Sequence, residues 1–165
     1  MGAMDHVDRI LEQWRAERPD LDPSPMAVVG RLSRAAAAME RELETTFAAH
    51  GIDASTFDVL ATLRRHGAPF RLAPAALAQE SMITTSAVAQ RLNRLEALGL
   101  VTRLPRPEDG RGKLVELTAA GRELVDRVLP DHISTEEALL APLDAAERRT
   151  LAELLARLDP MDPRR

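Results

Sequence analysis

Apolar residues recur at helical spacing along most of the chain. In the first such segment Val7, Ile10, Leu11 and Trp14 fall on one face, and the pattern breaks over Pro19–Pro25. A later helical segment contains Pro130, where we expect an interruption or a kink. The spacing and the capping residues together predict helices over Asp5–Arg18, Ser24–His50, Asp53–His66, Ala73–Glu80, Thr84–Leu98, Thr118–Leu143 and Asp144–Leu158.

Two short β-prone segments interrupt this helical pattern. Leu100–Leu104 and Lys113–Thr118 are separated by Pro105–Gly112, which is rich in turn residues, and they predict a hairpin. The three preceding helices, of which the last two are short and joined by a tight turn, match a helix-turn-helix. The predicted fold is mainly α with a small β-hairpin wing, a winged helix-turn-helix.

Length and composition narrow the class of protein. The 165 residues suit one folding unit, and 45% apolar but only 2% aromatic residues favour packed helices. Cysteine is absent and the four histidines have no ligand spacing, so we expect no metal and no cofactor. Without a membrane span, a signal peptide or a catalytic motif, the expected protein is cytoplasmic and not an enzyme.

The predicted helix Thr84–Leu98 has two different faces. Val88, Leu92, Leu95 and Leu98 fall within one arc, which we expect to face the core. The opposite face is small and polar, which suits base edges in a major groove, while Arg94 and the helix N-terminus suit phosphates. An ordinary solvated helix face is the alternative interpretation. The candidate residues of this helix for DNA contact are Thr85, Ser86, Gln90, Asn93 and Arg94.

Positive charge is concentrated around the hairpin although the formal net charge is −4. The segment 91–113 has six basic and three acidic residues. A hairpin directly after a recognition helix can reach the minor groove or the phosphate backbone. Arg106, Arg111 and Lys113 are therefore candidate DNA contacts of the wing.

The segment from the recognition helix through the wing resembles the MarR family of transcriptional regulators. The resemblance is carried by Leu95–Val101 (LEALGLV) and by Arg106–Gly121 (RPEDGRGKLVELTAAG). Where many members have paired arginines after the wing aspartate, Gly110 replaces the first and Arg111 remains. The resemblance implies a homodimer that binds double-stranded DNA at an inverted repeat, usually as a repressor released by a small ligand.

The same resemblance divides the single folding unit into three parts. It implies N-terminal helices over 1–50 for dimerisation and a wall of a ligand pocket. The winged helix-turn-helix that binds DNA then covers 51–118, and C-terminal dimerisation helices cover 119–165.

Two arginines lie on apolar arcs of their helices. Arg64 falls between Phe57 and Leu60, and Arg91 falls on the core side of the recognition helix. A charge in such a place needs a partner, and Asp58 is the nearest candidate in the sequence. An internal salt-bridge network and a ligand pocket are the two interpretations of this pattern.

Trp14, Asp58, Arg64 and Arg91 together resemble the ligand-binding set of the urate-responsive branch of the MarR family, which also has an extra N-terminal helix. This resemblance implies urate as the effector, and an indole and two guanidiniums suit such a planar aromatic anion. A phenolic acid, an antibiotic or another aromatic metabolite is the alternative effector. A helical interaction module that does not bind DNA is the alternative function.

Overall fold

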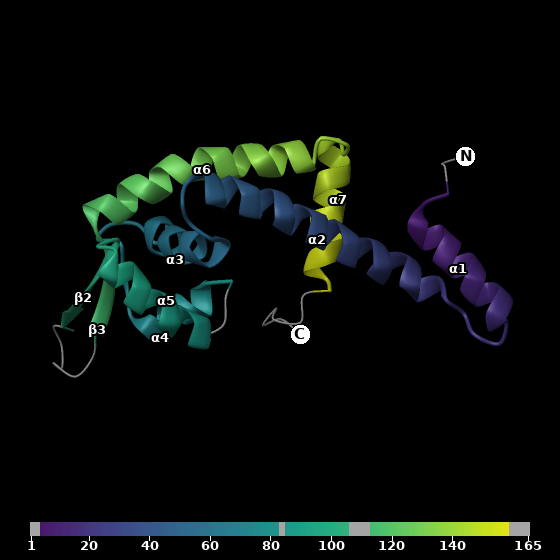
Figure 1. Ribbon diagram of the computed structural model, residues 1–165, viewed down its shortest axis with the longest axis horizontal. Coiled ribbons are helices and arrows are strands. Elements are labelled where there is room, and N and C mark those ends of the chain that lie inside the picture. The colour runs from purple at the N-terminus through teal and green to yellow at the C-terminus, as the bar shows by residue number, and fades with distance from the viewer. Residues whose placement is uncertain (1–3, 83–84, 106–112, 159–165) are drawn as a thin grey trace. The chain divides into compact units, whose positions relative to one another are not determined.

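The computed structural model describes residues 4–82, 85–105 and 113–158 (Figure 1). The helices and strands follow one another along the chain in the order α1 (His6–Glu17), α2 (Ser24–Ala49), α3 (Ala54–Arg65), β1 (Arg71–Leu72), α4 (Pro74–Glu80), α5 (Thr85–Ala97), β2 (Val101–Pro105), β3 (Lys113–Leu117), α6 (Ala119–Leu139) and α7 (Ala145–Ala156). The predicted helices and hairpin are confirmed with ends shifted by a few residues. None of the helices in the described ranges is long and apolar enough to cross a membrane.

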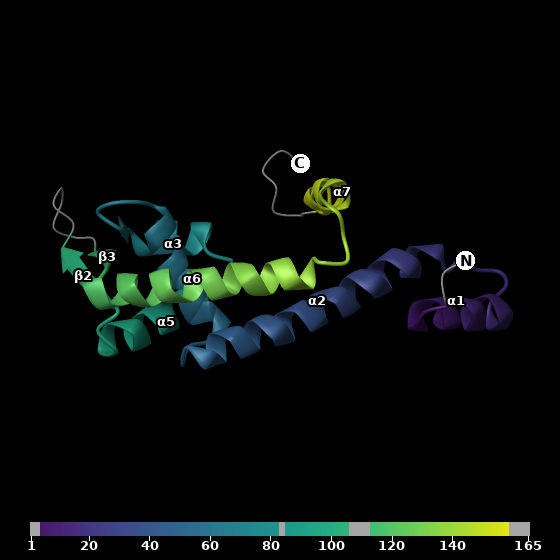
Figure 2. The ribbon, with the colours of Figure 1, turned by 90° about the horizontal axis from the view of Figure 1, so that it is seen from above.

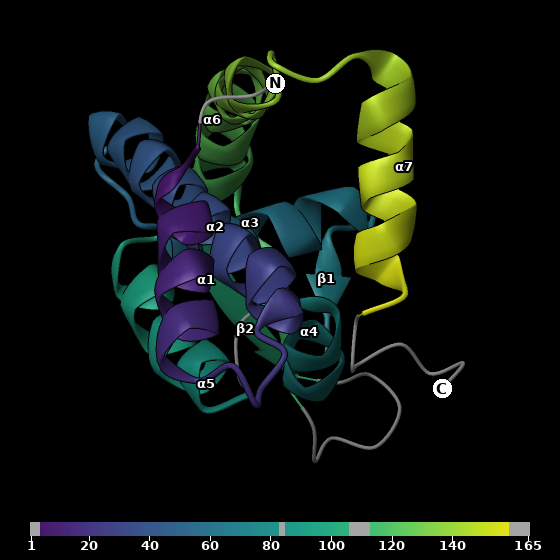
Figure 3. The same cartoon turned by 90° about the vertical axis from the view of Figure 1, so that its right-hand side faces the viewer.

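The chain forms two compact units, Met1–Glu42 and Leu43–Arg165. In the first unit, α1 folds back beside the beginning of α2 (Figure 3). Asp5 caps α1 in a reciprocal capping box with Asp8. Arg31 of α2 pairs with both carboxylates, at 2.9 Å to Asp5 and 2.6 Å to Asp8, and so ties the two helices together.

The second unit has one hydrophobic core, built from the end of α2, from α3, α4, α5 and α6, and from the sheet. Its largest fully buried side chains include Leu60 and Leu63 of α3, Leu77 of α4 and Leu92 of α5. A three-stranded antiparallel sheet, in the order β1-β3-β2, closes one end of this core. The sheet meets the beginning of α6, where Thr118 donates its backbone N–H to the carbonyl of Leu100 (Figure 2).

Three details differ from the sequence prediction. Strand β1 was not predicted, because a strand of two residues is too short to show an alternation of apolar and polar positions. It lies antiparallel to β3, with Arg71 opposite Glu116. Helix α6 continues through Pro130 without interruption. Leu98 is 60% exposed and not in the core, because α5 ends at Ala97 and Leu100 packs against the core after the turn at Gly99.

Candidate nucleic-acid interface and ligand pocket

One face of helix α5 packs against the core, and the opposite face is exposed to solvent. Val88, Leu92 and Leu95 are buried, which fixes the rotation of the helix about its axis. Gln90, Asn93 and Arg94 are consequently exposed. Thr85 and Ser86 begin the helix, and their side chains are outside the described part of the structure. The helix is therefore oriented with a polar surface of amides and one guanidinium outward.

Arg103 of β2 connects the first strand of the wing to this polar surface. Its Nη2 donates to Asn93 Oδ1 at 2.7 Å, and its Nη1 pairs with the carboxylate of Glu96. In the sequence Arg103 is only one of the six basic residues of the segment 91–113, and no pattern there indicates its partners. Its contacts depend on the pairing of β2 against β3 and on the turn at Gly99, which helical spacing does not reveal.

Lys113 is the second cation among the described residues of the wing, after Arg103. Lys113 begins β3 opposite Pro105 and is exposed. Arg106 and Arg111, which we also predict to contact DNA, lie outside the described residues.

Asp53 connects the beginning of α3 to the inner side of α5. Its carboxylate caps α3 by accepting the Thr56 N–H at 2.7 Å, and it pairs with Arg91 at 2.9 Å and more distantly with Arg94 at 3.9 Å. Burial acts to raise the pKa of Asp53, but hydrogen bonds from Thr56 and Ser55 together with the charge of Arg91 outweigh it, and the pKa falls below its ordinary value. The carboxylate is therefore ionised at neutral pH.

We expect Asp53→Ala to lower the free energy of unfolding by about 1 kcal/mol at pH 7, the usual cost of a lost helix cap. Because the folded-state pKa is lowered, this contribution is present above the ordinary carboxyl pKa of 3.8 and is lost as the pH falls through the folded value. Urea unfolding at pH 7 and below pH 4 measures the difference between variant and wild type. A difference that stays constant across this range would contradict the role of the charge.

Arg64 lies at the other end of α3, in contact with α6. Its Nε donates to Asp126 at 2.7 Å, and its guanidinium carbon lies 5.2 Å from the centre of the Phe70 ring. Asp58, the candidate partner in the sequence, does not pair with Arg64. Its carboxylate instead accepts the backbone N–H of Met82 at 2.8 Å. Asp126 was missed because the docking of α6 on α3 brings together residues far apart in the sequence.

A pocket of about 470 Å³ lies between α3 and α6 around this pair. Apolar side chains form much of its wall, and charged side chains also line it. His132 adds a ring that packs against Phe57, with centroids 4.7 Å apart, and its buried Nδ1 has no hydrogen-bond partner in the part of the chain that is described. The lining residues are Phe57, Asp58, Ala61, Arg64, Arg65, Met82, Val125, Asp126, Leu129 and His132.

The four predicted ligand residues are not all brought together. Asp58 and Arg64 line the pocket, whereas Arg91 pairs with Asp53 at the opposite end of α3 and is only 23% exposed. The ion pair between Arg91 and Asp53 joins α5 to the beginning of α3, which agrees with the interpretation of an internal salt-bridge network for Arg91. Trp14 belongs to the N-terminal unit, where it is 45% exposed.

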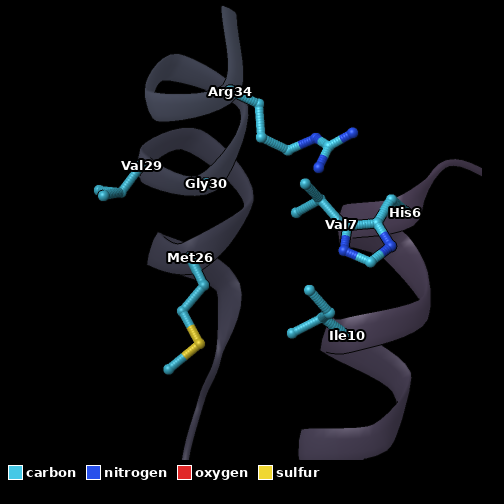
Figure 4. Close-up of a pocket in the computed structure, with 7 residues that line it drawn as sticks. All are labelled: His6, Val7, Ile10, Met26, Val29, Gly30 and Arg34. Atoms are coloured by element: carbon cyan, nitrogen blue, oxygen red, sulfur yellow. The ribbon is translucent and has the colours of Figure 1, made fainter. Parts of the chain in front are cut away.

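The N-terminal unit has a separate groove between α1 and α2, with a volume of about 400 Å³. Figure 4 shows Val7, Ile10 and Met26 along the groove, with Arg34 and His6 toward one end. None of the predicted DNA-binding or ligand-binding residues lines it. No group of three or more metal-ligating side chains occurs among the described residues of either unit.

Comparison with known proteins identifies the class to which this fold and this surface belong. The model of the MarR family matches residues 50–112. The HTH-type transcriptional regulator PecS of Dickeya dadantii is 40% identical over 153 residues, which cover 93% of this chain and 92% of the relative. The chain belongs to the MarR family, and it is a DNA-binding transcriptional regulator with a winged-helix fold.

Solved structures agree with this assignment. A MarR family regulator from Streptomyces coelicolor in complex with DNA superimposes with a TM-score of 0.76 at 26% identity, covering 84% of this chain and 87% of that chain. BpsR of Bordetella bronchiseptica, whose DNA binding is regulated by 6-hydroxynicotinic acid, superimposes with a TM-score of 0.74 at 27% identity. The match covers 82% of this chain and 94% of that chain. These relatives are regulators and not enzymes.

Proposed function

We propose that this regulator is a homodimeric repressor which binds an inverted-repeat operator and is released by a small aromatic anion, with urate as the first candidate. The observation that carries the DNA-binding part is the exposed polar face of α5 beside a basic hairpin. Relatives of this fold have been solved with DNA bound, and the DNA binding of BpsR is regulated by 6-hydroxynicotinic acid, itself an aromatic acid.

The pocket between α3 and α6 is the proposed effector site. Among the lining residues, Phe57 supplies an aromatic ring, and Arg64 and Arg65 supply positive charge. A planar anion that pairs with Arg64 competes with Asp126 for the guanidinium. The chemistry of the pocket thus suits a flat ring carrying a carboxylate or an acidic nitrogen.

Helix α3 is the proposed connection between effector and DNA. Arg64 stands near its C-terminus in the pocket, and Asp53 caps its N-terminus while holding Arg91 of α5. Arg91 does not line the pocket, so a ligand bound there is not proposed to contact both Arg64 and Arg91. The effect of ligand binding is proposed to reach α5 along α3. A small rotation of this helix moves the anchor of α5, and both recognition helices of a dimer must keep their spacing on DNA.

The dimer is proposed from the apolar side chains left exposed on the terminal helices. In the second unit these side chains include Leu129 and Ile133 of α6 and Leu151, Leu154 and Leu155 of α7. Soluble monomers rarely expose this many large apolar groups, and a second copy of the chain is the proposed cover.

Replacing Arg64 by methionine tests the effector site. We expect the concentration of urate needed to release DNA to rise roughly tenfold to a hundredfold, the usual contribution of a charge-assisted hydrogen bond. Affinity for DNA without ligand should change little. Arg122→Met is the matched control, because Arg122 also lies over Phe70, at 5.7 Å, but does not line the pocket.

The measurement titrates urate, 6-hydroxynicotinate and salicylate against the protein–DNA complex, with Trp14 fluorescence recorded in parallel. Release by urate that is weakened in Arg64→Met and retained in Arg122→Met supports the proposal. Release by salicylate alone would assign a phenolic effector and remove the urate hypothesis. Equal responses of both variants would remove the pocket from the mechanism.

A further inference from the structure

Arg103 holds two side chains of α5 at once. Its Nη2 donates to Asn93 Oδ1 at 2.7 Å, while Nη1 pairs with Glu96 one helical turn further on. The Arg103 side chain is only 23% exposed, whereas Asn93 is exposed. A half-buried guanidinium anchored by a carboxylate thus fixes the orientation of an amide on the outer face of the helix.

This contact decides which end of the Asn93 amide remains free. A guanidinium has only hydrogen-bond donors, so the amide must offer its oxygen to Arg103 and keep its NH₂ group for another partner. The favoured pairing of asparagine with adenine needs both ends, since the NH₂ donates to N7 and the oxygen accepts from the N6 amino group. The oxygen keeps a second lone pair, but its bond to Arg103 fixes the direction of the amide, so the oxygen is no longer free to turn toward an adenine amino group.

We propose that Arg103 is a positioning residue that sets the base preference of Asn93. It favours contacts of the Asn93 NH₂ group with acceptors on the base edge, namely purine N7, guanine O6 and thymine O4, and weakens the preference for adenine that a free asparagine would have. This inference rests on the proposed assignment of the outer face of α5 to base contacts.

The sheet provides a matched control for a merely structural role. Arg71 of β1 pairs with Glu116 of β3, and so is also an arginine on a strand with a carboxylate partner. Its carboxylate partner belongs to the sheet and not to α5. Loss of Arg71 therefore reports what a broken strand ion pair does to the protein when the Asn93 amide is untouched.

The experiment measures binding of wild type, Asn93→Ala, Arg103→Met, Arg71→Met and the double variant Asn93→Ala/Arg103→Met to operators carrying each base at each position. Asn93→Ala identifies the position that Asn93 reads. At that position Arg103→Met is expected to raise the adenine-to-guanine preference at least about fivefold, because the freed oxygen completes the adenine pairing. Arg71→Met and the double variant should show no such shift, and thermal unfolding checks that every variant is folded.

The outcomes separate this inference from the proposal beneath it. If Asn93→Ala changes the preference at one position but Arg103→Met leaves the adenine-to-guanine ratio unchanged, Arg103 does not position the amide and only this inference is overturned. If Asn93→Ala changes no position, the assignment of the outer face to bases fails as well. A shift that survives in the double variant would also overturn the inference, since it would arise without Asn93.

Discussion

Gly121→Ala is expected to lower the free energy of unfolding by about 1–3 kcal/mol or more, as overpacking does in a close-packed interior. Thr118 caps α6 by accepting the Gly121 N–H, which brings the first turn of this helix against the end of the α5–β2 turn. A Cβ at Gly121 would stand 2.1 Å from the carbonyl oxygen of Leu100 and 2.8 Å from Leu117 Cδ1. The nearer contact is backbone, so relief requires α6 to move away from the sheet.

Gly30→Ala in α2 is the control for this prediction. A Cβ at Gly30 meets only the methyl groups of Val7, at 3.5 and 3.6 Å, which is ordinary contact. In a helix interior the change should be neutral or should stabilise by roughly 0.5–1 kcal/mol. Urea unfolding of both variants measures the two effects, and equal stability of the Gly121 and Gly30 variants would contradict the packing described at Leu100.

Gln90→Ala is expected to reduce discrimination between operator variants by about 1–3 kcal/mol at the base it contacts, which is the usual contribution of a bidentate amide. The reason is its exposed place on α5, opposite the buried Val88, Leu92 and Leu95. Arg111→Ala should instead weaken binding to all sequences alike. The slope of log affinity against log salt should become shallower by about one, because one phosphate contact is lost.

Gel-shift competition with operator and random DNA at several salt concentrations distinguishes these two effects. Equal losses on specific and random DNA for Gln90→Ala would contradict the assignment of its face. A change of base preference in Arg111→Ala would contradict a phosphate contact by the wing.

Helix positions were predictable because they depend on local signals. The spacing of apolar residues and the caps Thr118 and Asp144 determine where α6 and α7 begin, and both caps form as predicted. The hairpin was predictable because the turn residues of Pro105–Gly112 separate two β-prone segments. Local rules failed at Leu98, whose exposure depends on where the core beneath α5 ends.

The partners of the charged residues were not predictable in the same way. Arg64 and Arg91 were expected to need partners, and each has one, but Asp126 and Asp53 come from other elements. Which carboxylate meets which guanidinium depends on how α6 and α5 dock on α3. For the same reason Arg103 gave no signal, since its contacts arise from the turn that brings β2 back beside α5.

We expect this regulator to read a specific operator through α5 and the wing. The most direct test measures the affinity of the wild-type protein for its own promoter region and for scrambled DNA of the same length as salt is raised. The protein should bind the promoter preferentially, with log affinity falling linearly against log salt by roughly 0.9 for each phosphate neutralised. Binding that is equal on both DNAs, or absent from both at low salt, would contradict it.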